Sequence, residues 1–192
     1  MPGKTHSNIQ WLNVKNGKLQ NKQVSFDSFE GNIVQIERKE EEYEGNKYWA
    51  WILTFNDGTD TVTKIQMREE SWYCYGFFAR LIFCNAQVPV ELGAVLPSGR
   101  DKGSYCYIRQ NGILIDVKSQ ETRDLIVAQI PEPKVVLDAK GNPVKVNNRE
   151  LKDWTDTADG FIKIAAKWNA TPLQVSANEA PQPPASSDLL PF

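Results

Sequence analysis

Residues 47–68 read KYWAWILTFNDGTDTVTKIQMR, and the fold is predicted outward from this segment. Residues 47–55 alternate as a β-strand does, with large or apolar side chains on both faces. One face carries Trp49, Trp51, Leu53 and Phe55, and the other carries Tyr48, Ala50, Ile52 and Thr54. Asn56-Asp57-Gly58 is a turn signal, and residues 61–67 alternate again. We therefore expect a central hairpin whose first strand is covered on both faces, with Trp51 in the core.

The elements on either side of this hairpin follow a known order. A strand is expected over residues 29–38, then an acidic loop over residues 40–46. After the hairpin, Glu69-Glu70-Ser71 opens a helix over residues 72–85, because negative charge and a capping hydroxyl stabilise a helix N-terminus. Two or three strands follow, at residues 92–96, 104–110 and 113–117, where the last two flank an Asn-Gly turn. Three strands, a helix and two more strands are the order of the oligonucleotide-binding (OB) fold.

The predicted fold is therefore mainly β, with an OB-type five-stranded Greek-key barrel over residues 25–130 and the helix between its third and fourth strands. A different small barrel and an antiparallel α+β sheet stay open as alternatives. Residues 1–24 are expected to form a basic hairpin turning at Asn16-Gly17, with four lysines and no acid. Residues 131–170 are expected to add an accessory hairpin, with strands at 135–137 and 144–146, and a helix over about 153–169 that packs on the barrel.

The end of the chain has a different composition. Residues 171–187 contain four prolines and no glycine, lysine or arginine. Such a segment cannot bury enough apolar surface to offset its chain entropy, so we expect a disordered linker. The chain then finishes with an apolar cluster behind one acid, Asp188-Leu189-Leu190-Pro191-Phe192. An exposed apolar cluster after a proline-rich spacer is typical of a partner-binding tip.

Composition and spacing exclude several classes of function. No apolar run is long enough to span a bilayer and no signal-like segment opens the sequence, so we expect a cytoplasmic protein without membrane contact. Cys74, Cys84 and Cys106 form no C-x-x-C pair and are predicted to be reduced, buried thiols. With His6 as the lone histidine and no phosphate-binding or dinucleotide motif, we expect no metal, no cofactor and no enzymatic activity.

The tip and the start of the barrel carry a resemblance to a known family. Residues 188–192, and the segments FEGNIVQI at 29–36 and WLNVKNGKL at 11–19, resemble the single-stranded DNA-binding proteins of bacteria and, most closely, of their viruses. The resemblance implies an OB barrel that coats and protects single-stranded DNA without sequence specificity. It also implies a C-terminal tip that recruits replication, recombination and repair proteins. The family tip usually has two or three consecutive acids, whereas here Asp188 stands alone after two serines.

Candidate DNA-binding residues follow from the strand alternation. Single strands bind where aromatic side chains stack on bases and basic side chains meet the backbone. In residues 104–110, Cys106 and Ile108 are expected to point inward, which leaves Tyr105, Tyr107 and Arg109 outside. The alternative is that the two tyrosines lie beneath the last helix. The other candidates lie at strand ends, on outer faces or in the loop after residue 96, and they are Arg38, Lys47, Tyr48, Trp49, Lys64, Arg68, Arg100 and Lys102.

The formal net charge of −2 does not exclude nucleic acid, because the charges are separated: five acids lie in residues 37–44 and two in the tail, while residues 1–24 hold four lysines and no acid. Two rival functions use the same barrel. One is a protein-binding adaptor of the replication machinery, and the other is an RNA-binding regulator. Self-association is open, since the family includes monomers, dimers and tetramers.

Overall fold

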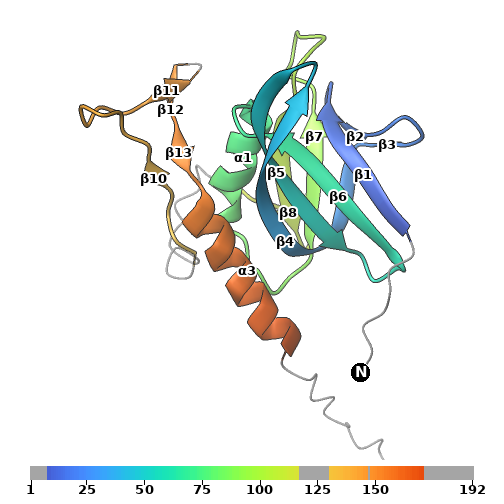
Figure 1. Cartoon of the computed structure of the whole chain (residues 1–192). Coiled ribbons are helices and arrows are strands. Elements are labelled where there is room, and N and C mark those ends of the chain that lie inside the picture. Colours follow the sequence, from blue (N-terminus) through green and yellow to red (C-terminus); the bar gives the residue numbers. More distant parts are fainter. Residues whose placement is uncertain (1–7, 117–129, 147, 171–192) are drawn as a thin grey trace, which may run out of the picture.

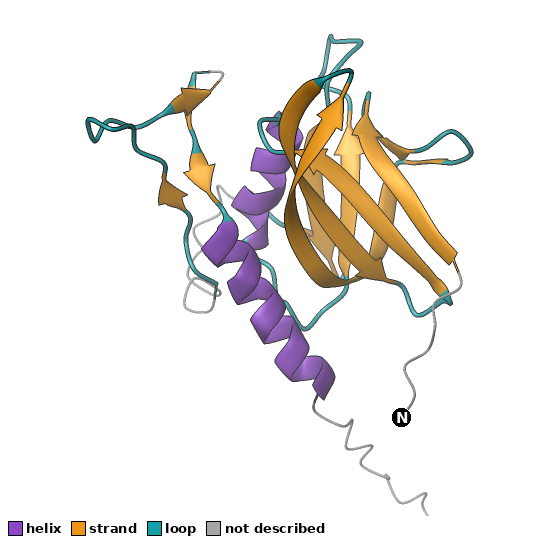
Figure 2. Ribbon diagram, viewed as in Figure 1, coloured by secondary structure: helices purple, strands orange, loops and turns teal. Residues whose placement is uncertain are grey.

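The structure is a computed structural model that describes residues 8–116, 130–146 and 148–170, and these residues are mainly β (Figure 1). One large sheet has the strand order β3-β2-β1-β6-β5-β4-β7-β8-β9. Its strands and the helix between them are β1 (Asn8–Lys15), β2 (Lys18–Gln20), β3 (Ser25–Phe26), β4 (Ser28–Tyr43), β5 (Asn46–Asn56), β6 (Thr61–Arg68), α1 (Trp72–Leu81), β7 (Val90–Val95), β8 (Tyr105–Gln110) and β9 (Ile113–Leu114). Figure 2 shows the sheet curving round, with both helices along one side.

The central hairpin is as predicted. β5 pairs antiparallel with β4 and β6, and Leu53 lies opposite Ile36 and Ile65. Trp51, Leu53 and Phe55 belong to the hydrophobic core. Ala50 and Ile52, on the other face of β5, are also buried. The expectation that both faces are covered, with Trp51 in the core, is confirmed.

β4 is longer than predicted, and the acidic loop expected at residues 40–46 is wrong. The strand runs through the glutamates to Tyr43 and turns at Glu44-Gly45, both of which have positive φ. Glu40 pairs with Trp49 and Glu42 with Lys47, so the backbone ladder and the ion pair from Lys47 Nζ to Glu40, 2.9 Å long, extend the hairpin. Pairing with β5 therefore overrides the loop-like composition.

The basic N-terminal hairpin belongs to the main sheet. Its Asn16-Gly17 turn has φ values of 50° and 72°, as a type I′ turn requires. β1 pairs parallel with β6, which sets Leu12 beside Ile65. Leu12 and Leu19 are completely buried. A Cβ at Gly17 would lie 2.5 Å from the Leu96 nitrogen, so this close contact requires glycine.

Helix α1 begins where predicted and ends earlier. The Ser71 hydroxyl accepts a hydrogen bond from the Cys74 N–H at 3.0 Å and caps the first turn. The helix ends at Leu81 rather than Asn85, and residues 82–84 continue as a turn. Its buried side chains close the core, where the Phe78 ring lies 4.8 Å from that of Trp51.

The C-terminal part combines a β-arm with the last helix. Its elements are β10 (Lys134–Val135), β11 (Lys145–Val146), β12 (Arg149–Glu150), β13 (Lys152–Asp153) and α3 (Thr155–Ala170). The predicted hairpin is present only in part: its two segments meet at an isolated bridge between Leu137 and Pro143, whereas β10 pairs with β13 and β11 with β12, two strands that the sequence pattern did not indicate. Trp154 stacks on Phe78 with ring centroids 5.1 Å apart. The predicted helix is confirmed, and it packs against β4 while the arm extends away from the main sheet (Figure 1).

The closed five-stranded barrel is not confirmed. The sheet ends at β3 and β9, and no pairing among the described residues joins these ends or links β6 to β8. β6 pairs with β1 instead, so the N-terminal hairpin takes the edge at which a five-stranded barrel would close. The expected linker at 171–187 and tip at 188–192 lie outside the described residues. Within the described residues, no helix is long and apolar enough to cross a membrane.

Candidate nucleic-acid interface

Three adjacent strands turn aromatic and basic side chains toward the same side of the sheet. Alternation places Tyr48 of β5 on the face opposite to Trp51, and Lys64 and Arg68 of β6 on the face opposite to Ile65. The parallel pairing sets Trp11 of β1 beside Lys64. We call these residues, Trp11, Tyr48, Lys64, Gln66 and Arg68, the outer face.

Each basic residue of the outer face lies over an aromatic ring. Lys64 Nζ is 5.4 Å from the centroid of the Trp11 ring, and the Arg68 guanidinium carbon is 4.4 Å from that of Tyr48. Neither cation has a carboxylate partner among the described residues. A ring that carries a cation offers a stacking surface and a charge at the same place.

Most other cations on the strands of the large sheet pair with acids. The ion pairs are Lys18–Asp27, Arg38–Glu69, Lys39–Glu37, Lys47–Glu40 and Arg109–Glu91, with a sixth, Lys134–Asp156, between the arm and α3. A cation with a carboxylate partner has little charge left for a phosphate. The outer face therefore keeps its positive charge free, and among the other cations on the described strands of the large sheet only Lys15 of β1 also lacks a carboxylate partner.

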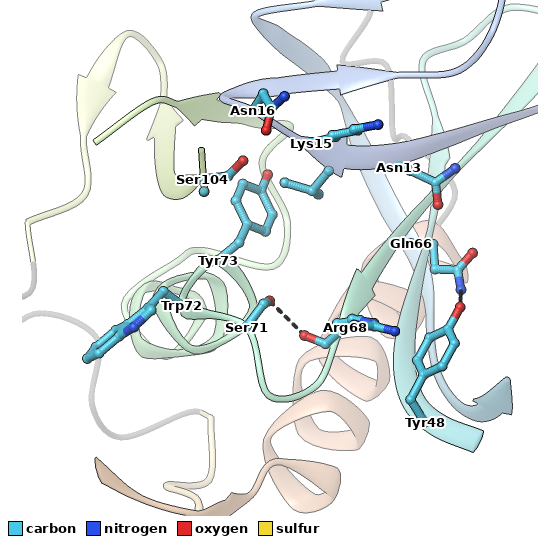
Figure 3. A pocket seen from close by; sticks show the side chains of 12 residues that line it. Asn13, Lys15, Asn16, Tyr48, Gln66, Arg68, Ser71, Trp72, Tyr73 and Ser104 are labelled. Atoms are coloured by element: carbon cyan, nitrogen blue, oxygen red, sulfur yellow. Dashed lines mark hydrogen bonds between the residues drawn. The ribbon is translucent and has the colours of Figure 1, made fainter. Parts of the chain in front are cut away.

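A groove continues the outer face toward α1 (Figure 3). Its volume is about 430 Å³, within the usual range for small-molecule pockets. The lining comes from the N-terminal hairpin, β5, β6, the start of α1 and the end of the loop before β8: Asn13, Val14, Lys15, Asn16, Tyr48, Gln66, Arg68, Ser71, Trp72, Tyr73, Gly103 and Ser104. It contains two cations and no acid, so the groove suits an anionic or acceptor-rich ligand.

The polar side chains of the groove fall into two groups. Some have protein partners: Ser71 Oγ donates to the Arg68 carbonyl at 2.7 Å, and Gln66 Nε2 donates to the Tyr48 hydroxyl at 3.4 Å. The side chains of Asn13, Lys15 and Asn16 have no such partner among the described residues. Figure 3 shows these hairpin residues along one side of the groove, with Tyr73 and Ser104 on another.

Trp49 and Arg38, which the sequence grouped with Tyr48, lie on the opposite face of the sheet. The Trp49 side chain is 43% exposed, and Arg38 stacks on its ring at 4.1 Å. Arg38 also donates two hydrogen bonds of 2.9 Å to Glu69, which raise the pKa of its guanidinium. Neighbouring residues of a strand point to opposite sides, so Tyr48 and Trp49 cannot belong to one surface.

The tyrosines of β8 form a second exposed surface. Cys106 and Ile108 point inward as predicted, and Tyr105 is 45% exposed. The Tyr107 ring lies across Gly93, where a Cβ would come within 2.0 Å of it. Arg109 stacks on Tyr107 at 5.0 Å and lies 3.3 Å from Glu91. The last helix packs on β4 rather than over these tyrosines, so the alternative that it covers them is wrong.

Of the remaining predicted residues, two lie in the loop that leads into the groove and one lies away from it. Arg100 and Lys102 are exposed in the loop between β7 and β8, which leads into Gly103 and Ser104. Lys47 is on the far hairpin and is paired with Glu40. On the β4 side of the outer face, Glu41 lies opposite Tyr48, so negative charge borders the basic area there.

The sequence did not indicate the contribution of the N-terminal hairpin. Trp11, Asn13 and Lys15 alternate with Leu12 and Val14, so alternation gives their common face. The parallel pairing with β6, more than fifty residues away, brings that face beside Lys64. Alternation alone does not indicate a partner strand.

The cysteines are structural. Cys74, Cys84 and Cys106 are free and buried, as predicted, and burial raises the pKa of the Cys106 thiol to about 12. Within the described residues, no three His, Cys, Asp or Glu side chains are grouped to hold a metal ion.

Comparisons with protein-family models, curated proteins and solved structures found no match.

Proposed function

We propose that this protein binds single-stranded DNA without strict sequence specificity, along the outer face and through the groove. The observation that carries the proposal is the pair of unneutralised cations on aromatic rings, Lys64 on Trp11 and Arg68 on Tyr48. Each ring can stack on a base, a contact that contributes about 1–3 kcal/mol and tolerates any base. The cations are placed to meet the phosphates on either side.

The spacing of the two cation–ring pairs and the need of each ring for a free base face favour a single strand over a duplex. Lys64 and Arg68 are four residues apart on β6, which corresponds to roughly 13 Å along the strand. This distance spans several nucleotides of one chain. In a duplex the faces of the bases are stacked on each other, so the rings of Trp11 and Tyr48 would have no base face to contact.

The finer fold that fits this function is an OB-type barrel extended by the N-terminal hairpin. The order β4, β5, β6, α1, β7, β8 supports it. So does β4, whose residues Ser28–Gly31 pair with β7 while the rest pair with β5. In this proposal, β1 and β2 are an addition that widens the binding face.

The cellular role rests on the resemblance to viral and bacterial single-stranded DNA-binding proteins. The resemblance supports a cytoplasmic role in the replication, recombination or repair of DNA, with residues 188–192 as the recruiting tip. The protein would act as a binding protein and not as an enzyme.

The test is a titration of the full chain against labelled single-stranded thymidine oligonucleotides of about 16 nucleotides, the upper end of OB-fold site sizes. Fluorescence anisotropy at about 50 and 200 mM salt would report affinity and its salt dependence. We expect binding at low salt, and weaker binding to a duplex of equal length. Absence of binding at low salt would refute the proposal and favour the protein-binding adaptor. Tighter binding to the matching RNA would favour the RNA-binding regulator.

A further inference from the structure

Tyr73, the second residue of α1, carries a buried hydroxyl without a normal partner. The side chain is 1% exposed, and its oxygen makes no hydrogen bond within the described residues. The hydroxyl interacts with the Cys106 thiol, whose sulfur is only a weak hydrogen-bond acceptor. Burial raises the pKa of the hydroxyl well above its ordinary value, so the hydroxyl keeps its proton. A buried, unsatisfied polar group destabilises a fold, so its position calls for an explanation.

The Tyr73 side chain borders the groove. Figure 3 shows its ring rising from α1 toward the hairpin residues Lys15 and Asn16. Ser104, another lining residue, accepts a hydrogen bond of 2.9 Å from the Gly17 N–H, and its own proton has no acceptor among the described residues. Two hydroxyl protons that have no oxygen or nitrogen acceptor in the described part of the chain therefore border one groove.

The groups around these hydroxyls are mostly hydrogen-bond donors. Lys15 and Arg68 can only donate, and no carboxylate lines the groove. The free amide of Asn16 can turn either its donor or its acceptor inward. A ligand that matches this lining presents acceptors.

We infer that the groove holds one unstacked base of the bound strand, with acceptor atoms of its edge facing the hydroxyls of Tyr73 and Ser104. The inference rests on the proposed function and adds a base preference at one position. At the edge that carries O4 of thymine and O6 of guanine, these two bases present a carbonyl acceptor, whereas adenine and cytosine present an amino donor in its place, with N7 as adenine's acceptor there. The groove therefore favours thymine or guanine over adenine.

A base fits this position better than a phosphate does. The Tyr73 hydroxyl is buried beside the apolar Val14 and the α1 core, where a phosphate would lose its hydration. The cations that would compensate a phosphate, Lys15 and Arg68, are exposed. The flat edge of a neutral base can reach the hydroxyl while its phosphates stay at those cations.

The test compares Tyr73→Phe with a matched control, Tyr75→Phe, in the full chain. Tyr75 lies on the same helix but packs against Trp154 of the C-terminal part, 5.8 Å between ring centroids, and does not line the groove. Both changes remove one hydroxyl and keep the ring. The dissociation constants for oligonucleotides of thymidine and of deoxyadenosine are measured for each protein. The readout is the ratio of the two dissociation constants, and comparing this ratio between variant and wild type cancels the different stacking of the two free oligonucleotides.

We expect Tyr73→Phe to lower the thymidine preference by about two- to tenfold, the effect of one hydrogen bond, without lowering the melting temperature. Tyr75→Phe should keep the wild-type ratio. Ser104→Ala, a second variant for the same inference, should lower the ratio in the same direction.

An unchanged ratio in both Tyr73→Phe and Ser104→Ala would overturn the inference, because neither hydroxyl would then contact the base. Equal loss of affinity for both oligonucleotides would also overturn it, because the hydroxyl would then act on the backbone. If the wild-type protein bound neither oligonucleotide, the proposed function itself would have failed, which is a distinct outcome.

Discussion

The salt dependence of binding gives the sharpest test of where the DNA lies. The outer face and groove hold three cations, Lys15, Lys64 and Arg68, that have no acidic partner within residues 8–116, 130–146 and 148–170. Each phosphate neutralised on a single strand contributes about −0.7 to the slope of log affinity against log salt. Three contacts give a slope of about −2, so raising the salt from about 50 to 200 mM weakens binding by about 20-fold.

Replacing one of these cations removes one contact. For Arg68→Gln the slope should become shallower, from about −2 to about −1.4, and the same change of salt should weaken binding by only about sevenfold. The matched control is Arg109→Gln, because Arg109 also lies over a tyrosine ring, at 5.0 Å, but is 3.3 Å from the carboxylate of Glu91. Its removal should leave the slope near −2.

Anisotropy titrations of a labelled thymidine oligonucleotide at four or more salt concentrations would give these slopes. The comparison separates the two exposed aromatic surfaces of the sheet. If Arg109→Gln flattened the slope and Arg68→Gln did not, the DNA would lie on β7 and β8. The assignment of the outer face would then be wrong.

Three further outcomes follow from the same geometry. Trp11→Ala should raise the dissociation constant about fivefold or more, because one stacked base is lost. Trp49 is equally exposed but lies on the opposite face, so Trp49→Ala should leave the dissociation constant unchanged. Anisotropy titrations measure both. Leu12→Ala should lower the free energy of unfolding by about 2–5 kcal/mol in guanidinium titrations, while Leu137→Ala, exposed on the arm, should change it by less than about 0.5 kcal/mol. The free energy of unfolding should also fall as the pH rises above about 9, because the unfolded chain releases the Cys106 proton there while the folded chain holds it to about pH 12. Urea unfolding at pH 8 and 10 checks this prediction. An unchanged urea midpoint would contradict it.

Local pattern was sufficient to predict the central part of the fold. Alternation and the Asn-Asp-Gly turn gave β5 and β6, and the Ser71 cap gave the start of α1. The glutamates after Arg38 misled the prediction, because their composition is typical of a loop while their pairing with β5 is set by the opposite strand. The edges of the sheet were not predictable, since the parallel contact of β1 with β6 depends on tertiary structure.

The candidate site was predicted in part for the same reason. Alternation placed Tyr48 away from Trp51 and placed Lys64 and Arg68 on the polar side of β6, and the structure brings these three together. Distance along the sequence gave no reason to add Trp11. The sequence pattern also did not predict ion pairs between strands. Arg109 differs from Arg68 because it pairs with Glu91 on the neighbouring strand.

The N-terminal hairpin shows why point substitutions, and not truncations, must test this site. Along β1, Leu12 enters the core while its neighbours Trp11 and Asn13 face outward. One strand therefore supplies packing on one face and binding groups on the other. Deleting residues 8–20 would remove Leu12 and Leu19 from the core together with Trp11 and Lys15 from the interface. A loss of DNA binding after such a deletion would follow from unfolding as readily as from loss of the site, whereas Trp11→Ala changes only the exposed face.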